Sequence, residues 1–134
     1  MDDAALIDRA RSVLRWRQLS EDCSASEVSA ALETVSGNTF VGVSISAACG
    51  VGACAEYGAV VQMVTAGESQ IRKIVAVASD GKIIPPCGRC RELLYQVDRR
   101  NLRTQIILAG GKLVTLANLL PYPWQDAWTE RSSR

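Results

Sequence analysis

Three cysteines and one carboxylate stand at spacings that suit metal chemistry. Cys54 and Glu56 open an apolar run, and Cys87 and Cys90 follow Pro86. Both segments predict helix starts, where unpaired N–H groups and the helix dipole stabilise thiolates. Cysteines three apart in a first turn can direct both sulfurs to one point, and three protein ligands leave the fourth position of a tetrahedral zinc open. The sequence therefore predicts one catalytic zinc per chain, held by Cys54, Cys87 and Cys90.

Glu56 is the candidate catalytic residue, because it lies two positions beyond a metal ligand. Its neighbours Ala55, Ala59 and Val60 predict a buried helix, where an unpaired carboxylate is costly unless it has a function. Such a carboxylate can take a proton from a zinc-activated water and pass it to a ring nitrogen and a leaving group. The backbone N–H groups of Ala55 and Cys87 can donate to developing charge on the substrate. Hydrolytic removal of an amino group fits this arrangement.

Other interpretations of these residues stay open at this level. The cysteines can be ordinary buried thiols, or Cys49 can join them in a closed four-thiolate zinc site without catalysis. Glu56 can be an ion-paired or solvated helix residue. Arg89 and Arg91 can either neutralise the thiolates or lie on the helix surface. Two further function classes follow, a non-catalytic small-ligand binder and a structural zinc protein. No role is assigned to Cys23.

Composition limits the class of protein. A chain of 134 residues that is 48% hydrophobic predicts one domain spanning residues 1–134. A net charge of +1 argues against a long nucleic acid and favours a small-molecule substrate. The absence of histidine excludes Ser-His and Cys-His catalysis. Few cysteines, no signal-like start and no apolar run of membrane length predict a cytoplasmic protein with no membrane partner.

Hydrophobic periodicity indicates which elements position the site. Pro85 and Pro86 cannot continue a helix, so they place a helix start at Cys87. Gly110 and Gly111 make a short link between two strands, which favours an antiparallel pair. Residues 20–24 are polar and turn-like. The expected elements are helices over 2–18, 54–64 and 87–97 and strands over 27–35, 39–45, 71–78, 105–108 and 112–114.

The spacing Cys-x-Glu followed by Pro-Cys-x-x-Cys resembles the zinc-dependent cytidine deaminase superfamily in its all-cysteine version. The resemblance extends over most of the chain to small cytidine deaminases and blasticidin-S deaminases, and the run Pro86–Arg91 is especially similar to the latter. Further matching segments are Ser20–Asp22, Ser29–Leu32, Thr39–Val43 and Leu119–Pro121.

The resemblance implies a three-layer α/β/α fold with a mixed sheet of about five strands. It also implies zinc-dependent hydrolytic deamination of a cytosine-type nucleoside or related amino-heterocycle, in a homotetramer whose sites are shared between subunits. The aromatic tail, with Trp124, is similar to family tails that close over the base.

The implied substrate contacts differ from those of the family. Small cytidine deaminases hold ribose with Asn-x-Glu, whereas Ser44 and Ser46 stand at the matching positions, and Ser26 matches a phenylalanine used against the nucleoside. Tyr57 replaces the arginine that commonly follows the catalytic glutamate. With Ala55, these serines are the expected substrate contacts, and cytidine is expected to be a poor substrate.

Overall fold

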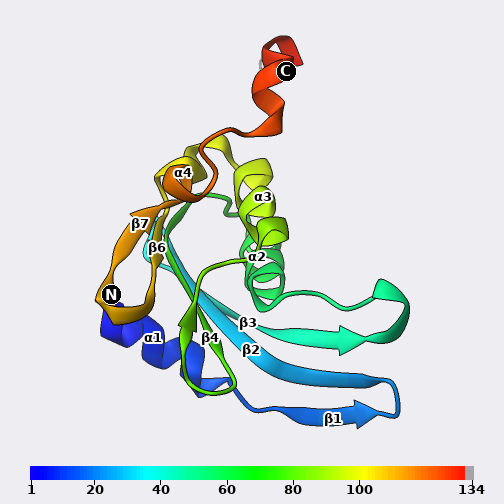
Figure 1. Cartoon of the computed structure of the whole chain (residues 1–134). Coiled ribbons are helices and arrows are strands. Elements are labelled where there is room, and N and C mark those ends of the chain that lie inside the picture. The colour runs from blue at the N-terminus through cyan, green and yellow to red at the C-terminus, as the bar shows by residue number, and fades with distance from the viewer. Residues whose placement is uncertain (132–134) are drawn as a thin grey trace.

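The structure is a computed structural model that describes residues 1–131, in which one mixed sheet carries helices on both faces (Figure 1). The strands are β1 Arg17–Ser20, β2 Cys23–Thr34, β3 Thr39–Ala47, β4 Ile71–Ala78, β5 Ile83–Ile84, β6 Gln105–Ile107 and β7 Leu113–Thr115. The α-helices are α1 Asp3–Ser12, α2 Ala55–Thr65, α3 Gly88–Val97 and α4 Leu116–Leu119. Short 3₁₀ helices are η1 Ala48–Gly50, η2 Arg99–Arg103, η3 Ala109–Gly111 and η4 Trp124–Arg131.

The long strand β2 organises the sheet. It pairs antiparallel with β3 along one side, and with β1 and then β4 along the other. The small strand β5 pairs antiparallel with β4, and β4 pairs parallel with β6, with Ile74 opposite Ile106. The last pair, β6 and β7, is antiparallel, with Gln105 opposite Thr115. This confirms the arrangement predicted from the two glycines between these strands.

Alternation along β2 and β4 divides the core into two layers. On one face Ala31, Val75 and Val77 pack against Leu6 and Ala10 of α1. On the other face, α2 and α3 cover the adjacent strand positions, and the cluster there includes Leu32, Ala59, Met63, Ile74, Leu94 and Ile106. Successive residues of a strand point to opposite faces of the sheet, so β2 and β4 contribute apolar side chains to both layers. The three-layer α/β/α fold expected from the sequence is confirmed.

One close contact fixes the helix that carries the site against the sheet. Gly42 of β3 faces α2 so closely that a Cβ atom there would lie 2.4 Å from the carbonyl oxygen of Ala55 and 2.4 Å from the nitrogen of Ala59. Only glycine permits this backbone approach. The start of α2, with Cys54 and Glu56, is therefore held at a defined height above β3.

Two expectations, about the length of the first helix and about the number of strands, are wrong. The first helix ends at Ser12 instead of residue 18, and residues 17–20 form β1, which pairs with β2. The Ser26 hydroxyl accepts from the Arg15 N–H and donates to the Val13 carbonyl, so a tertiary contact holds the chain where the helix ends. The sheet has seven strands instead of about five, because the short β1 and β5 join it.

No helix in the described part of the chain is long and apolar enough to span a bilayer.

Candidate metal centre and active site

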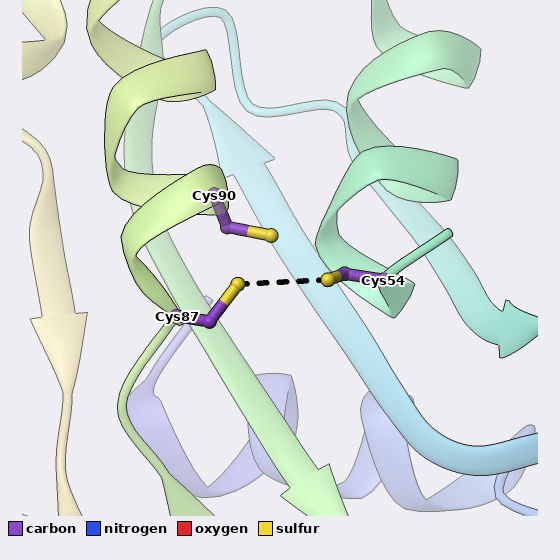
Figure 2. Close-up of side chains that lie close together, drawn as sticks. All are labelled: Cys54, Cys87 and Cys90. Carbon is purple, nitrogen blue, oxygen red and sulfur yellow. Dashed lines mark hydrogen bonds between the residues drawn. The ribbon is translucent and has the colours of Figure 1, made fainter. Parts of the chain in front are cut away.

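The three predicted ligands converge between the starts of two helices (Figure 2). Cys54 and Cys87 are the N-cap residues of α2 and α3, both with extended backbone, and Cys90 lies in the first turn of α3. Their sulfur atoms lie within 4.8 Å of one another, and the Sγ atoms of Cys54 and Cys87 are 3.5 Å apart. A tetrahedral zinc with bonds of about 2.3 Å places its sulfur ligands about 3.8 Å apart. The donor set therefore fits zinc in type and in spacing.

The other two cysteines lie elsewhere. Cys49 is exposed in η1 with a φ of 60°, and within residues 1–131 it is not part of the sulfur cluster. Cys23 is half-buried at the start of β2 and also lies outside the cluster. The closed four-thiolate alternative is therefore not what the structure shows.

The thiols influence one another's protonation. Burial, followed by the hydrogen bond with Cys87, raises the pKa of the Cys54 thiol. Burial and the nearby Glu56 carboxylate raise the pKa of Cys90 well above its usual range. For Cys87, hydrogen bonds from the Cys90 backbone and the Cys54 thiol outweigh burial, and the pKa is lowered. Three thiolates at such short range repel one another, so a divalent cation is the natural partner of this cluster.

Glu56 is buried beside the cluster, in the first turn of α2, with 4% of its surface exposed. The ion pairs of the described residues do not include it, so the ion-paired alternative is wrong. Ile74, Pro86 and Ile106 lie around a small space next to it. Burial raises the pKa of this carboxyl, and a hydrogen bond with Cys90 acts in the opposite direction. A buried carboxyl of this kind is well placed to hold or release a proton.

A cavity of about 380 Å³ opens in front of Glu56 and the sulfur cluster. Cys54, Ala55 and Glu56 at the start of α2 form part of its lining, and Cys87 lines it from the start of α3. Ser44 and Ser46 of β3 also line it, and the Ser44 hydroxyl oxygen accepts a 2.9 Å hydrogen bond from the Val28 N–H. The structure thus brings together most of the residues predicted for the site.

Two predicted substrate contacts are not brought to this cavity. Ser26 is fully buried, and its hydroxyl is engaged by Val13 and Arg15 as described above. Trp124 is 57% exposed in η4 and does not line the cavity. Figure 1 shows the tail beyond α3 and α4, and no described residue of the tail lines the cavity of its own chain.

Other lining residues were not singled out as substrate contacts from the sequence. Glu27 and Val28 come from β2, and Ile84 and Pro85 precede α3. Of these residues only Pro85 gave a signal in the sequence, because it cannot continue a helix. The two arginines near the cysteines, Arg89 and Arg91, have different surroundings. Arg91 donates to the carbonyls of Pro86 and Leu119, which ties α3 to the chain around it, whereas Arg89 is exposed and lines the cavity.

Known proteins are similar to this chain in sequence and in fold. The family model "Cytidine and deoxycytidylate deaminase zinc-binding region" matches residues 2–105. A cytidine deaminase of Halalkalibacterium halodurans is 29% identical over 98 residues, which are 71% of this chain and 74% of that protein.

Solved structures agree with this match. The cytidine deaminase of Mycobacterium leprae has a TM-score of 0.76 at 26% identity, over 91% of this chain and 99% of that one. The enzyme of Burkholderia pseudomallei has a TM-score of 0.74 at 26% identity, over 92% of this chain and 99% of that one. The zinc-ligand geometry, the buried glutamate and the fold thus point to one conclusion. The chain belongs to the cytidine and deoxycytidylate deaminase family of zinc-dependent hydrolytic deaminases.

Proposed function

We propose that this chain removes the exocyclic amino group of a cytosine-type nucleoside or related amino-heterocycle by hydrolysis, with Glu56 as the proton carrier. One observation carries the proposal: a buried carboxylate, which has no ion pair within residues 1–131, lines a cavity together with two cysteines of the three-sulfur cluster. The cavity is large enough for a heterocycle with a substituent. Family membership supports the same reaction class.

The roles of the chain's own residues follow from their positions. The sulfurs of Cys54, Cys87 and Cys90 hold the metal, and a bound zinc supplies a positive charge that makes water acidic near neutral pH. Glu56 accepts the proton of the attacking water and delivers protons to the ring nitrogen and to the departing ammonia. The carbon–oxygen bond forms first, as the ring C=N bond opens and its nitrogen takes up a proton, and the bond from the same carbon to the protonated amino nitrogen then breaks as ammonia leaves. The N–H groups at the start of α2, including that of Ala55, face developing charge.

The substrate end of the cavity differs from the family pattern. Ser44 and Ser46 offer short hydroxyls where an amide and a carboxylate would hold the sugar. A site that hydrogen-bonds hydroxyls can discriminate by about ten-thousand-fold, and shorter groups forfeit part of that discrimination. We therefore propose that plain cytidine is a poor substrate and that a bulkier or differently substituted aminopyrimidine is preferred.

A homotetramer is part of the proposal. Tyr57, Val61 and Val64 are exposed on α2 at helical spacing, which leaves an apolar stripe that a second copy of the chain can cover. The tail with Trp124 extends from its own body, so a lid role requires the cavity of a neighbouring subunit. Sedimentation at micromolar concentration tests this, and a monomer there contradicts it.

The decisive experiment is ammonia release from a panel of aminopyrimidines by the zinc-loaded protein. A rate that depends on zinc and on Glu56 supports an enzyme. Binding of panel members without ammonia release supports the alternative of a non-catalytic binder. Zinc with all four positions filled by protein supports the structural alternative.

A further inference from the structure

The cavity has two charged side chains that the proposed mechanism does not use. Glu27 of β2 and Arg89 of α3 both line it, and both are exposed. Within residues 1–131 neither side chain forms a hydrogen bond or ion pair, with the other or with a third residue. An unpaired carboxylate that lines a cavity is available to a ligand. The position of Glu27 at this cavity depends on the local shape of β2.

A bulge in β2 places Glu27 at the cavity. Ala25 pairs with Ile45 and Ser29 pairs with Val43, so β2 uses four residue steps where β3 uses two. Ser26 has a φ of 66°, in the left-handed region that a serine adopts only at a cost. Bulges of this kind are frequent next to active sites, where they redirect side chains. Here the bulge spans the segment that contains Glu27.

Buried contacts hold this bulge in place. The Ser26 hydroxyl accepts from the Arg15 N–H at 2.7 Å and donates to the Val13 carbonyl at 2.9 Å. These bonds tie the left-handed residue to the segment that follows α1, on the far side of the sheet from α2. The backbone next to Glu27 is therefore held by a tertiary contact within the chain.

The same bulge orients a second group. It places the Val28 N–H 2.9 Å from the Ser44 hydroxyl oxygen. This bond occupies a lone pair of that oxygen, and the hydroxyl proton is left to donate into the cavity. Ser46, exposed on the same strand, adds another hydroxyl. Together with the Glu27 carboxylate, these groups form a polar subsite on the side of the cavity made by β2 and β3.

We propose that Glu27 determines substrate specificity by accepting hydrogen bonds from hydroxyl or ammonium groups on the ring substituent, and that Ser26 is the residue that positions it. A carboxylate on β2 thereby supplies an ionised acceptor, which the short serines of β3 do not provide. The inference rests on the proposed function, because it assigns the substituent end of the same cavity. Its chemistry is general: an ionised carboxylate only accepts, so it selects for donors.

Binding of reaction products tests the inference without turnover. Zinc-loaded protein is titrated in a calorimeter with uridine, with 2′,3′-dideoxyuridine, which lacks the two secondary hydroxyls, and with 3′-amino-2′,3′-dideoxyuridine, which carries an ammonium group. Glu27→Ala is expected to lose about 10- to 100-fold in affinity for the first and third ligands relative to dideoxyuridine, as for a lost hydrogen bond to a charged group. The two donor ligands show which donor Glu27 serves.

The controls separate this effect from charge and folding. Glu21→Ala removes the same charge from the exposed turn before β2, outside the cavity, and should leave the affinity ratios unchanged. Glu27→Gln keeps the side-chain size but removes the charge. This variant should lose more affinity for the ammonium ligand than for uridine. Ser26→Ala removes the two hydrogen bonds that hold the bulge. Like Glu27→Ala, it should lower the affinity for the two donor ligands relative to dideoxyuridine.

Two outcomes overturn the inference. One is a wild-type protein that binds dideoxyuridine as tightly as both donor ligands. The other is a Glu27→Ala variant with the wild-type affinity ratios. Failure of the proposed function looks different, since no ammonia would then be released from any aminopyrimidine while the Glu27-dependent ratios in product binding persisted.

Discussion

Replacing Glu56 by glutamine should separate catalysis from metal binding. Glutamine has nearly the same shape and keeps the packing around Ile74 and Pro86, but it cannot carry the proton. Because the carboxylate serves both the attacking water and the leaving group, we expect kcat to fall by about 10²- to 10⁴-fold, the range for lost general acid–base catalysis. Glu56 is not among the three sulfur ligands, so the variant should still bind one zinc per chain.

The direction in which Glu56→Gln changes the free energy of unfolding can also be predicted. Burial raises the pKa of Glu56, which means that ionising it in the folded state costs free energy at neutral pH. A neutral amide avoids that cost, so the metal-free variant should unfold at the same or higher urea concentration than the wild type. Ammonia release, metal analysis and urea unfolding of the same preparation give the three quantities. Loss of zinc, or wild-type activity, would refute the role assigned to Glu56.

Glu33 provides a matched control. It is also a buried glutamate, with 5% of its surface exposed, but its carboxylate pairs with the Met1 ammonium at 3.0 Å and with Arg72 at 3.8 Å. Glu33→Gln should therefore lower the free energy of unfolding by about 1 kcal/mol, as for a partly exposed ion pair, and leave deamination intact. The two buried glutamates should thus respond in opposite ways.

Further changes test the metal, the helix contact, the substrate and an ion pair. Cys87→Ala should lose zinc and stability together, because metal binding is coupled to folding, as metal analysis and thermal unfolding would show. Gly42→Ala places a methyl group 2.4 Å from the Ala55 carbonyl, so it should destabilise by about 1–3 kcal/mol and reduce activity, and an unchanged unfolding midpoint would contradict the close contact. Cytidine should show a lower kcat/KM than aminopyrimidines with other substituents, and cytidine as the best of cytidine, deoxycytidine, cytosine and blasticidin S would refute this. Hydrogen bonds from the Arg100 side chain lower the pKa of Asp98 to about 2, below the unfolded value of about 3.9. That stabilisation is present above the unfolded pKa and is lost as the pH falls through about 2, so Asp98→Asn should flatten the acid limb of the stability curve measured by urea unfolding.

Local spacing predicted the chemistry of the site. Cys87 and Cys90 share one helical turn, so their sulfurs converge in any structure in which that turn forms, and Pro86 ensures that the turn begins there. Glu56 follows Cys54 in the first turn of its helix, which makes its closeness to the metal a local property as well. The antiparallel pairing of the last two strands followed from Gly110 and Gly111, because a short turn is encoded in neighbouring residues, whereas the fold class was an implication of the family resemblance.

Only the tertiary structure decided which residues face the substrate. The first helix stops at Ser12 because its exit is held by Ser26, a residue fourteen positions later in the chain, and no periodic pattern encodes such a bond. The bulge that contains Ser26 then breaks the alternation of β2, which hides Ser26 and leads Glu27 to the cavity. Side-chain direction in a strand follows a period of two only while the pairing is regular. At an irregular pairing it is fixed by contacts between distant segments, and these exist only once the chain has folded.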